Sequence, residues 1–484
     1  MLSRIMGLET EYGCLISDAA AASEIDASER KGGAGRGRLS RSPERISHQV
    51  KEYIFKRKKL GLVDLHHRTH DEPPGNGGFL LNGGRLYLDM GHLEYASPEC
   101  VTLADLVAHD RAGDAILQRT VEEMDLADQV SIIKNNIDHQ TGATFGSHEN
   151  YLVARDFPFS YDGLGQMLPF LVTRQIFTGS GRVGAHFAPE GWVLVGDKTP
   201  AVDYQLSQRA DHIVNDFYQW VQFNRAIINT RDEPLADPAR YRRIHLLVGD
   251  SNMLEYATAL KFGTTSLVLS LIEEGAVPDG WSLRDPVLDL KQISRDPSRR
   301  WIVTLENGRK ASAIELQEAF LREAEKQLRG KDADADWTLV EWRRTLESLA
   351  ADPDQLIGKI DWISKKWLLE TFMEAEGKEW NDPWMASLDL EYHNLNPARS
   401  LASALEEEGK APRLTSPAAV DLATGSPPRN TRASARGELI RFLLNKRLPY
   451  VINWSAFYID GKQLLSMEDP FKTYVSEAQQ YLKG

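Results

Sequence analysis

The chain has 484 residues, a formal net charge of −13 and 42% hydrophobic residues. This length predicts one large domain plus a smaller one, and the apolar content is sufficient for a folded core. The acidic balance argues against nucleic-acid binding, which relies on cations that replace phosphate counterions. The two cysteines, Cys14 and Cys100, exclude a disulfide framework and a cysteine-rich zinc site.

The N-terminal residues Met-Leu-Ser-Arg-Ile-Met-Gly lead directly into a predicted strand and contain no apolar signal core. We find no run that is long and apolar enough to span a bilayer. Together with the sparse cysteines, which fit a reducing compartment, these features predict a cytoplasmic protein with no membrane partner.

The first half of the chain mixes strands and helices around a polar insertion. Alternating charges predict a strand over 5–14, and the Ala-, Ser-, Gly- and Arg-rich composition of 19–45 predicts a flexible insertion. Ser42 and Pro43 suit the N-cap and first position of a helix over about 43–59. Further patterns predict strands at 84–90, 130–134, 149–154, 226–230 and 243–249, and helices at 103–124, 202–222 and 253–274.

The second half is predicted to be mainly helical. Glu306-Asn307-Gly308 favours a hairpin, because Asn-Gly suits a type I′ turn, and helices follow from 312 to 376. Prolines and small polar residues predict a linker or extended loop at 411–435. Residues 436–484 are expected to form a small C-terminal domain with a helix, a hairpin and a final helix. Strands and helices that do not alternate strictly indicate the α+β class.

The predicted strand at 84–90 carries a polar triplet on one face. Side chains alternate along a strand, so Arg85, Tyr87 and Asp89 share one face while Leu86 and Leu88 share the other. The leucines are expected to face a core. The polar face has two readings on spacing alone, a solvated surface or a binding site.

Three glutamates add to this polar face. Glu94 follows the strand closely, and Glu9 and Glu11 share a face of the first strand. Carboxylates crowded on a sheet repel one another unless a cation lies between them. Ligation by oxygen alone favours Mg²⁺ over zinc.

Three other segments have both a functional and an ordinary reading. The segment His148-Glu149-Asn150-Tyr151 can supply a further metal oxygen and a phosphate donor, or form a capped turn. The basic segments 231–234 and 240–243 can bind phosphate or an acidic partner, or form a surface salt-bridge cluster. Residues 179–184 match the dinucleotide-binding pattern, but no helical stretch follows them, so we reject that reading.

Two motifs near the N-terminus resemble those of the Pup ligase/depupylase family, which attaches or removes a small ubiquitin-like protein. They are Met6-Gly7-Leu8-Glu9-Thr10-Glu11-Tyr12-Gly13 and Asn82-Gly83-Gly84-Arg85-Leu86-Tyr87-Leu88-Asp89. The resemblance extends over nearly the whole chain through Lys134-Asn135-Asn136, Gly146–Leu152, Ser207-Gln208-Arg209-Ala210, Ile228–Pro234, Tyr241-Arg242-Arg243, Gly249–Met253 and Asp469-Pro470-Phe471.

The resemblance implies a fold and a set of site residues. The family is similar to glutamine synthetase and γ-glutamyl-cysteine ligase, which implies a curved antiparallel sheet backed by helices over 1–410 and a small C-terminal domain over 436–484. By position, it implies Mg²⁺ ligands at Glu9, Tyr87 and Glu94, ATP contacts from Arg85, Ser97 and Trp454, and a catalytic carboxylate at Asp89.

The resemblance also implies a reaction. The modifier's C-terminal side-chain carboxylate attacks Mg-ATP, the acyl phosphate reacts with a lysine of a target protein, and Asp89 takes the amine proton. The alternative is a depupylase or deamidase that hydrolyses the isopeptide or C-terminal amide and keeps ATP as a bound cofactor. A silent binding module for the modifier is a third reading, which the intact Asp89, Glu9 and Glu94 oppose.

The motifs point in both directions, and we favour the ligase. The short insertion before Asn82, the segment 249–253 and the ending Asp469-Pro470-Phe471 are similar to ligases. Glu11-Tyr12, the segment 181–184 and the spacing from Asp89 to Tyr95 are similar to depupylases instead.

Overall fold

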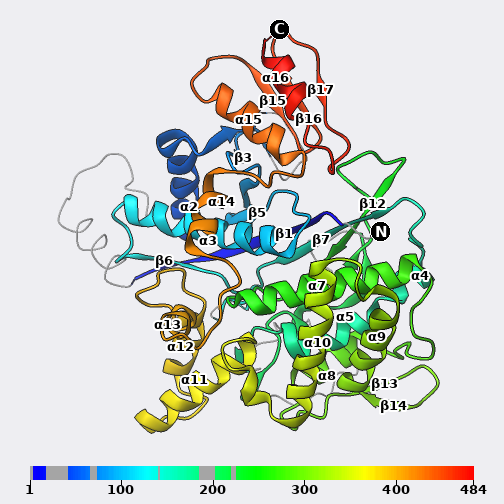
Figure 1. The fold of residues 1–484 in the computed structure, drawn as a ribbon. Helices are drawn as coiled ribbons and strands as arrows, with labels where there is room; N and C mark the ends of the chain where they lie inside the picture. The colour runs from blue at the N-terminus through cyan, green and yellow to red at the C-terminus, as the bar shows by residue number, and fades with distance from the viewer. Residues whose placement is uncertain are drawn as a thin grey trace, which may run out of the picture.

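The fold centres on one large sheet in a computed structural model that describes residues 4–17, 42–65, 73–139, 142–184, 202–219 and 225–483. The strand order is β10-β11-β12-β7-β1-β5-β4-β3-β2, and β6 pairs with β1 as a tenth strand (Figure 1). The strands are β1 (Met6–Ile16), β2 (Gly61–Val63), β3 (Gly77–Leu80), β4 (Arg85–Asp89), β5 (His92–Ala96), β6 (Val130–Ile133), β7 (Ser147–Ala154), β10 (Asn215–Tyr218), β11 (Ala226–Asn229) and β12 (Tyr241–Leu246).

Among the described strands of this sheet, β10 and β11 pair in parallel and the other neighbours pair antiparallel. The sheet and its many helices confirm the predicted α+β fold. The alternation of β1 shows how the sequence divides the two faces. Met6 and Leu8 are buried in the main core, while Glu9 and Glu11 are only half-buried on the other face.

Helices back the apolar side of the sheet (Figure 1). They are α2 (Pro43–Glu52), a π-helix (Tyr53–Lys58), α3 (Leu103–Glu123), α4 (Tyr161–Gly165), α5 (Leu168–Thr173), α6 (Gln175–Thr178), α7 (Glu255–Glu273), α8 (Pro286–Ser294), α9 (Ala313–Leu328), α10 (Ala333–Ala351), α11 (Asp361–Glu376), α12 (Pro383–Tyr392) and α13 (Leu401–Glu407). The Asn-Gly hairpin is confirmed as β13 (Ile302–Thr304) and β14 (Lys310–Ser312).

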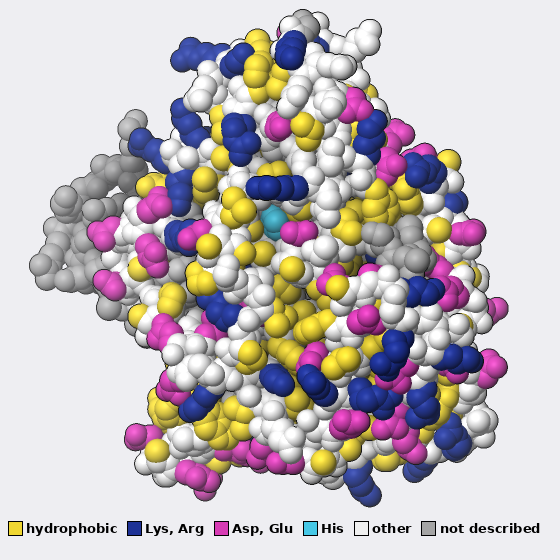
Figure 2. Space-filling model, viewed as in Figure 1, with side chains coloured by type: hydrophobic (Ala, Val, Ile, Leu, Met, Phe, Trp, Pro, Cys, Tyr) yellow, Lys and Arg dark blue, Asp and Glu magenta, His cyan; other side chains and the backbone are white. Residues whose placement is uncertain are grey.

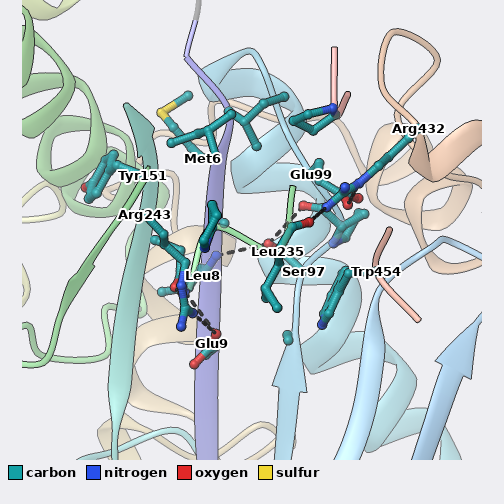
Figure 3. A pocket seen from close by; sticks show the side chains of 18 residues that line it. Met6, Leu8, Glu9, Ser97, Glu99, Tyr151, Leu235, Arg243, Arg432 and Trp454 are labelled. Carbon is teal, nitrogen blue, oxygen red and sulfur yellow. Dashed lines mark hydrogen bonds and ion pairs between the residues drawn. The ribbon is translucent and has the colours of Figure 1, made fainter. Parts of the chain in front are cut away.

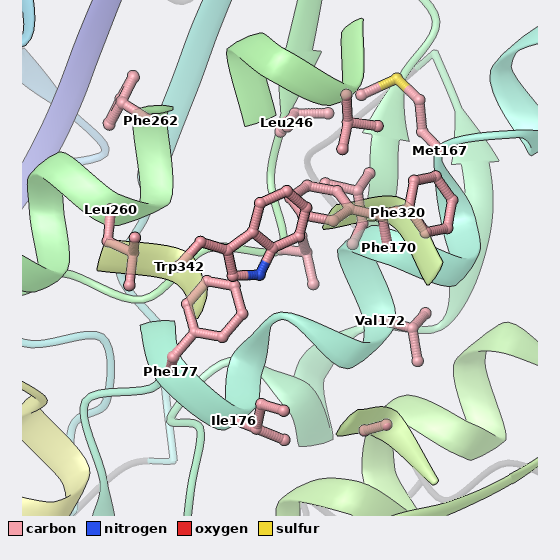
Figure 4. Close-up of a cluster of buried hydrophobic side chains, with 14 of the residues drawn as sticks. Met167, Phe170, Val172, Ile176, Phe177, Leu246, Leu260, Phe262, Phe320 and Trp342 are labelled. Carbon is pink, nitrogen blue, oxygen red and sulfur yellow. The ribbon is translucent and has the colours of Figure 1, made fainter. Parts of the chain in front are cut away.

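The main core lies between the sheet and these helices. Trp342 of α10 is fully buried and packs among aromatic side chains of α5 and α9, at 5.8 Å from the Phe170 ring (Figure 4). On the outer surface, charges of both signs are interspersed over α8, α9 and α10 (Figure 2). Ion pairs one turn apart, such as Arg322–Glu318, account for part of that pattern. Within the described residues, no helix is long and apolar enough to cross a membrane.

The C-terminal unit packs on the β2–β3 end of the sheet (Figure 1). It contains α15 (Ala433–Leu443), β15 (Tyr450–Ile452), β16 (Ala456–Ile459), β17 (Leu465–Ser466) and α16 (Val475–Lys483). Its core includes Leu62 of β2 and Phe79 of β3, so the sheet supplies part of the apolar surface that this unit buries. The predicted helix, hairpin and final helix are confirmed, while the domain boundaries at 410 and 436 stay predictions.

The helix predicted at 202–222 is wrong over its described part. That stretch holds β9 (Tyr204–Gln205), a 3-10 turn (Ala210–His212) and β10. The cause is a distant carboxylate. Asp250 accepts hydrogen bonds from the backbone N–H groups of Gln208 and Arg209 at 3.0 and 3.1 Å, which holds the backbone in a non-helical turn.

The linker prediction at 411–435 is wrong for residues 417–425. These form α14 (Pro417–Gly425), where Ser416 caps the first turn, Pro417 starts the helix, and the helix packs along α3. The flexible insertion predicted at 19–45 lies outside the described residues up to position 41, and α2 begins at Pro43 with Ser42 as its N-cap.

Candidate active site

The polar side of the sheet is built by register. Glu11 on β1 lies opposite Glu94 on β5, which lies opposite Tyr87 on β4. In the next row along the strands, Glu9 lies opposite Ala96, which lies opposite Arg85. Pairing positions share a face of a sheet, so these rows bring the glutamates of β1 beside the polar triplet of β4.

Two carboxylates of the first row, Glu11 and Glu94, meet a third from Asp89, which lies two residues further along β4 opposite His92. Glu11, Asp89 and Glu94 each offer a carboxylate oxygen, and these oxygens lie within 4.8 Å of one another. Burial raises the pKa of Glu94 well above 4.5, and the charges of the surrounding acids raise it further. The Tyr87 hydroxyl donates a hydrogen bond to Glu94, and burial also raises the pKa of this phenol. We call Glu11, Asp89 and Glu94 the acidic cluster.

A second group surrounds Glu9. Asn150 donates a hydrogen bond to Glu9 at 3.0 Å, and His148 Nδ1 lies 3.4 Å from its other oxygen. Arg243 and His245 each approach Glu9 to 3.9 Å. Burial raises the pKa of Glu9, but the hydrogen bond from His148 and the neighbouring positive charges outweigh burial and bring that pKa from 4.5 to about 2. We call Glu9, His148 and His245, which also offer metal-ligand atoms within 4.8 Å of one another, the Glu9 cluster.

Two of the three predicted nucleotide residues meet at one cavity, which Glu9 also lines (Figure 3). Ser97 and Trp454 both line it, together with Glu9, Arg243 and the start of β1. The Ser97 hydroxyl accepts the Leu8 N–H at 3.0 Å, which ties β5 to β1 at the cavity wall. Trp454 reaches the cavity from the C-terminal unit.

Arg85 does not line the cavity but contacts Tyr87, whose hydroxyl bonds Glu94 of the acidic cluster. Its guanidinium carbon is 4.4 Å from the centre of the Tyr87 ring and 5.9 Å from that of Phe79. Phe79 in turn packs edge-on against Trp454 at 5.0 Å. Of the seven residues predicted from the resemblance, the structure therefore brings all into one region, with Glu9 and Glu94 in neighbouring clusters.

Sequence reasoning missed several members of this region. Glu11 was seen on the polar face but not assigned a role, and Asn150 and His245 were not assigned one either. Their signal was alternation: Asn150 pairs with His245 between β7 and β12, and both face the same side as His148. The prediction failed because pairing between these distant strands cannot be read from spacing within one strand.

The prediction of Glu149 as a metal oxygen is wrong. Its side chain is fully buried on the opposite face, where Arg174 Nη1 donates to it at 2.9 Å and the Tyr151 hydroxyl donates at 2.6 Å. Residues 182–183 of the dinucleotide pattern form β8 (Arg182–Val183), and the stretch from 185 to 201, where the pattern would require a helix, lies outside the described residues.

The basic segment 240–243 divides between the surface and the site. Arg240 pairs with Asp469 at 2.9 Å at the surface, and Arg242 forms a half-buried ion pair with Asp232 at 2.6 Å. Arg243 turns inward and donates to Asn150 at 2.8 Å, beside Glu9. Only Arg243 of this segment therefore contributes to the clusters described above.

Comparisons with known proteins identify the family to which this chain belongs. A family model described as Pup-ligase protein matches residues 4–458. The Pup–protein ligase of Kineococcus radiotolerans is 38% identical over 97% of this chain and 96% of its own length. The depupylase of Acidothermus cellulolyticus is 37% identical over 91% of this chain and 88% of its own length.

Two solved structures share the fold. The Pup ligase PafA in complex with Pup matches with a TM-score of 0.82 at 32% identity, covering 100% of this chain and 91% of that chain. PafA in complex with ADP matches with a TM-score of 0.76 at 32% identity, covering 94% of this chain and 96% of that chain. The chain therefore belongs to the Pup-ligase family, whose enzymes are of the carboxylate–amine ligase type.

Proposed function

We propose that this chain is an ATP-dependent ligase that joins the C-terminal side-chain carboxylate of a Pup-like modifier to lysines of target proteins. The observation that carries the proposal is the acidic cluster lying beside a cavity lined by Ser97 and Trp454. The ADP complex of PafA supports a nucleotide in this cavity, and the Pup complex of PafA supports a Pup-like partner.

Magnesium fits the residues present. The acidic cluster offers only oxygen ligands, and its mutual repulsion is the condition that a divalent cation relieves. We assign Glu94 and Glu11 to this ion, with Glu9 and Tyr87 beside them as the resemblance implies. When bound, Mg²⁺ supplies neutralisation of phosphate charge.

The chain's own residues then have distinct tasks. Arg85, between Tyr87 and Phe79, is a cation placed to contact phosphate, and Trp454 offers a ring face to the nucleotide base. Asp89 accepts a proton from the lysine amine as the new C–N bond forms and the C–O bond to phosphate breaks. This role requires an ionised Asp89 within reach of the acceptor amine.

The opposite direction is the alternative function. A depupylase would use the same Asp89 to cleave the isopeptide or C-terminal amide while the nucleotide stays bound. The depupylase of Acidothermus cellulolyticus is as similar to this chain as the ligases are, so percentage identity does not separate the two directions. The family model and both PafA structures favour the ligase.

A single assay separates the two functions. The enzyme is incubated with ATP, a Pup-like modifier and a lysine-bearing protein, and in parallel with a preformed conjugate. Conjugate formation with release of ADP is the expected result. Cleavage of the conjugate without ATP turnover would establish the depupylase instead. The free cysteines Cys14 and Cys100 are consistent with the cytoplasm, which stays part of the proposal.

A further inference from the structure

A buried ionic triad joins the C-terminal unit to the cavity wall. Glu99 lies two residues after Ser97 and is 7% exposed. Arg432 Nε donates to one of its oxygens at 2.6 Å, and Arg436 donates to both. Burial raises the pKa of Glu99, but the two guanidinium groups outweigh burial and bring that pKa to about 2.

Arg436 also holds Trp454 directly. It is fully buried, and its Nη1 donates to the Trp454 carbonyl at 2.9 Å while its Nε donates to the Gly83 carbonyl at 2.9 Å. Its guanidinium carbon lies 4.9 Å from the centre of the Trp454 ring and 5.5 Å from that of Phe79. One planar group thus contacts the ring of Trp454, the backbone of the same tryptophan and the turn between β3 and β4.

These contacts extend into a stack that reaches the acidic cluster. Arg436 lies over Trp454 and Phe79, Phe79 packs against Trp454, and Arg85 lies over Phe79 and Tyr87. Cations over aromatic faces and edge-on ring pairs each add stabilisation beyond apolar burial. The stack therefore ties the ring expected to pack on the base to the cation expected to contact phosphate.

We infer that Arg436, held by Glu99, is a positioning residue that sets the orientation of Trp454 against the nucleotide. Phe79 of β3 supports the same ring by packing edge-on against it. The inference rests on the proposed nucleotide site. It makes the C-terminal unit a structural part of that site, because Trp454 is oriented by Arg436, whose partner Glu99 lies in the segment that follows β5.

The geometry requires arginine. The fork of the guanidinium donates to Gly83, Trp454 and both oxygens of Glu99 at once, whereas the single ammonium of lysine cannot reach all four acceptors. Arg436→Lys keeps the charge and most of the volume, so it tests positioning rather than charge. Phe79→Leu is a second, milder variant, since it keeps an apolar buried side chain and removes only the ring.

The test is a calorimetric titration of ADP with Mg²⁺ into the full chain, together with the ATP dependence of conjugation. Arg436→Lys is expected to raise the Kd for ADP and the KM for ATP about tenfold, with kcat at saturating ATP changed less than about threefold. Phe79→Leu is expected to move the same two constants in the same direction by a smaller factor.

The matched control is Arg111→Lys. Arg111 of α3 also bridges two carboxylates, Glu406 at 3.0 Å and Glu255 at 3.7 Å, and does not line the cavity. This control is expected to lose thermal stability while its Kd for ADP stays at the wild-type value.

Two results would overturn the inference. In the first, the Arg436 and Phe79 variants bind ADP as the wild type does. In the second, Arg111→Lys weakens ADP binding as much as Arg436→Lys does, which would mark a general loss of folding. A wild-type chain that binds no ADP would instead contradict the proposed function itself. Should Arg436→Lys fail to fold, Phe79→Leu decides the question alone.

Discussion

The two carboxylate groups on the polar face of the sheet differ in how their charge is balanced. The Glu9 cluster contains its own counter-charges, and the pKa of Glu9 falls to about 2. In the acidic cluster the surrounding acids reinforce the effect of burial, and the pKa of Glu94 rises. The two clusters meet at β1, which carries Glu9 and Glu11, and burial raises the pKa of both Glu9 and Glu94. The charges of the neighbouring side chains, rather than the depth of burial, therefore decide whether each pKa ends above or below 4.5. The charge of Glu9 is balanced by neighbouring protein side chains, whereas an added cation would stabilise the carboxylates of the acidic cluster most.

Asp89→Asn tests most strongly whether Asp89 serves in proton transfer while the other two carboxylates of the acidic cluster bind the metal. The amide keeps the shape and loses the proton acceptor, so conjugation should fall by about 10²- to 10⁴-fold. The Kd for ADP should stay within about threefold of the wild-type value, because the nucleotide residues are other side chains. Retained turnover would remove Asp89 from its assigned role.

Gly146→Ala tests whether the two clusters depend on the same glycine for the placement of their side chains. A Cβ at Gly146 would overlap the ends of both the Glu11 carboxylate and the His148 ring, one from each cluster. Both contacts are movable side-chain ends, so the fold should survive, while misplacement of these groups should lower kcat/KM on the order of 10- to 100-fold. Unchanged kinetics would show that neither side chain needs its observed position. Gly165→Ala, where a Cβ meets nothing within 4 Å, is the control.

Much of this site follows from sequence alternation, and the rest depends on distant pairing. The shared face of Arg85, Tyr87 and Asp89 could be read from one strand. The meeting of Glu11 with Glu94 could not, because it depends on the register between β1 and β5. Likewise, the turn at 208–209 follows from hydrogen bonds to Asp250, which local helix propensity does not contain.

The role of Trp454 in the proposed nucleotide site could be predicted only from the family resemblance. Trp454 carries no local pattern that marks a nucleotide residue, and its partner Arg436 reads as an ordinary cation in a helix. Their importance arises from the packing of the C-terminal unit on Phe79, which brings segments more than 300 residues apart in sequence into contact. By contrast, the C-terminal helix, hairpin and helix had strong local signals and were predicted correctly.

Glu9→Gln should destabilise the folded chain. Its folded pKa is lowered, so its contribution to stability is present above the ordinary value of 4.5 and is lost as the pH falls towards 2. At pH 7 the amide should lower the free energy of unfolding by roughly 1–3 kcal/mol, because hydrogen-bonded and charged partners lose their acceptor. Chemical denaturation at pH 7 measures this, and an unchanged midpoint would show that the Glu9 cluster is not internally balanced.

Glu94→Gln should change the free energy of unfolding in the opposite direction to Glu9→Gln, and by a smaller amount. A raised folded pKa gives stability that is present below the ordinary value of 4.5 and is lost as the pH rises through the folded pKa. Without Mg²⁺ at pH 7, the amide should therefore raise the free energy of unfolding by about 1 kcal/mol and weaken its decline with pH. A loss of stability in this variant would show that the Glu94 carboxylate is stabilised by its neighbours, as the Glu9 carboxylate is.

The most direct test is the proton balance of Mg²⁺ binding. Mg²⁺ is titrated into the ADP-bound chain at pH 7 in two buffers that differ in ionisation enthalpy, and the difference in heat gives the protons released. The account predicts proton release by the wild type that is lost in Glu94→Gln, and unchanged release in the Arg111→Lys control. Mg²⁺ binding with equal proton release in wild type and Glu94→Gln, or no Mg²⁺ binding at all, would contradict the assignment of the acidic cluster to the metal.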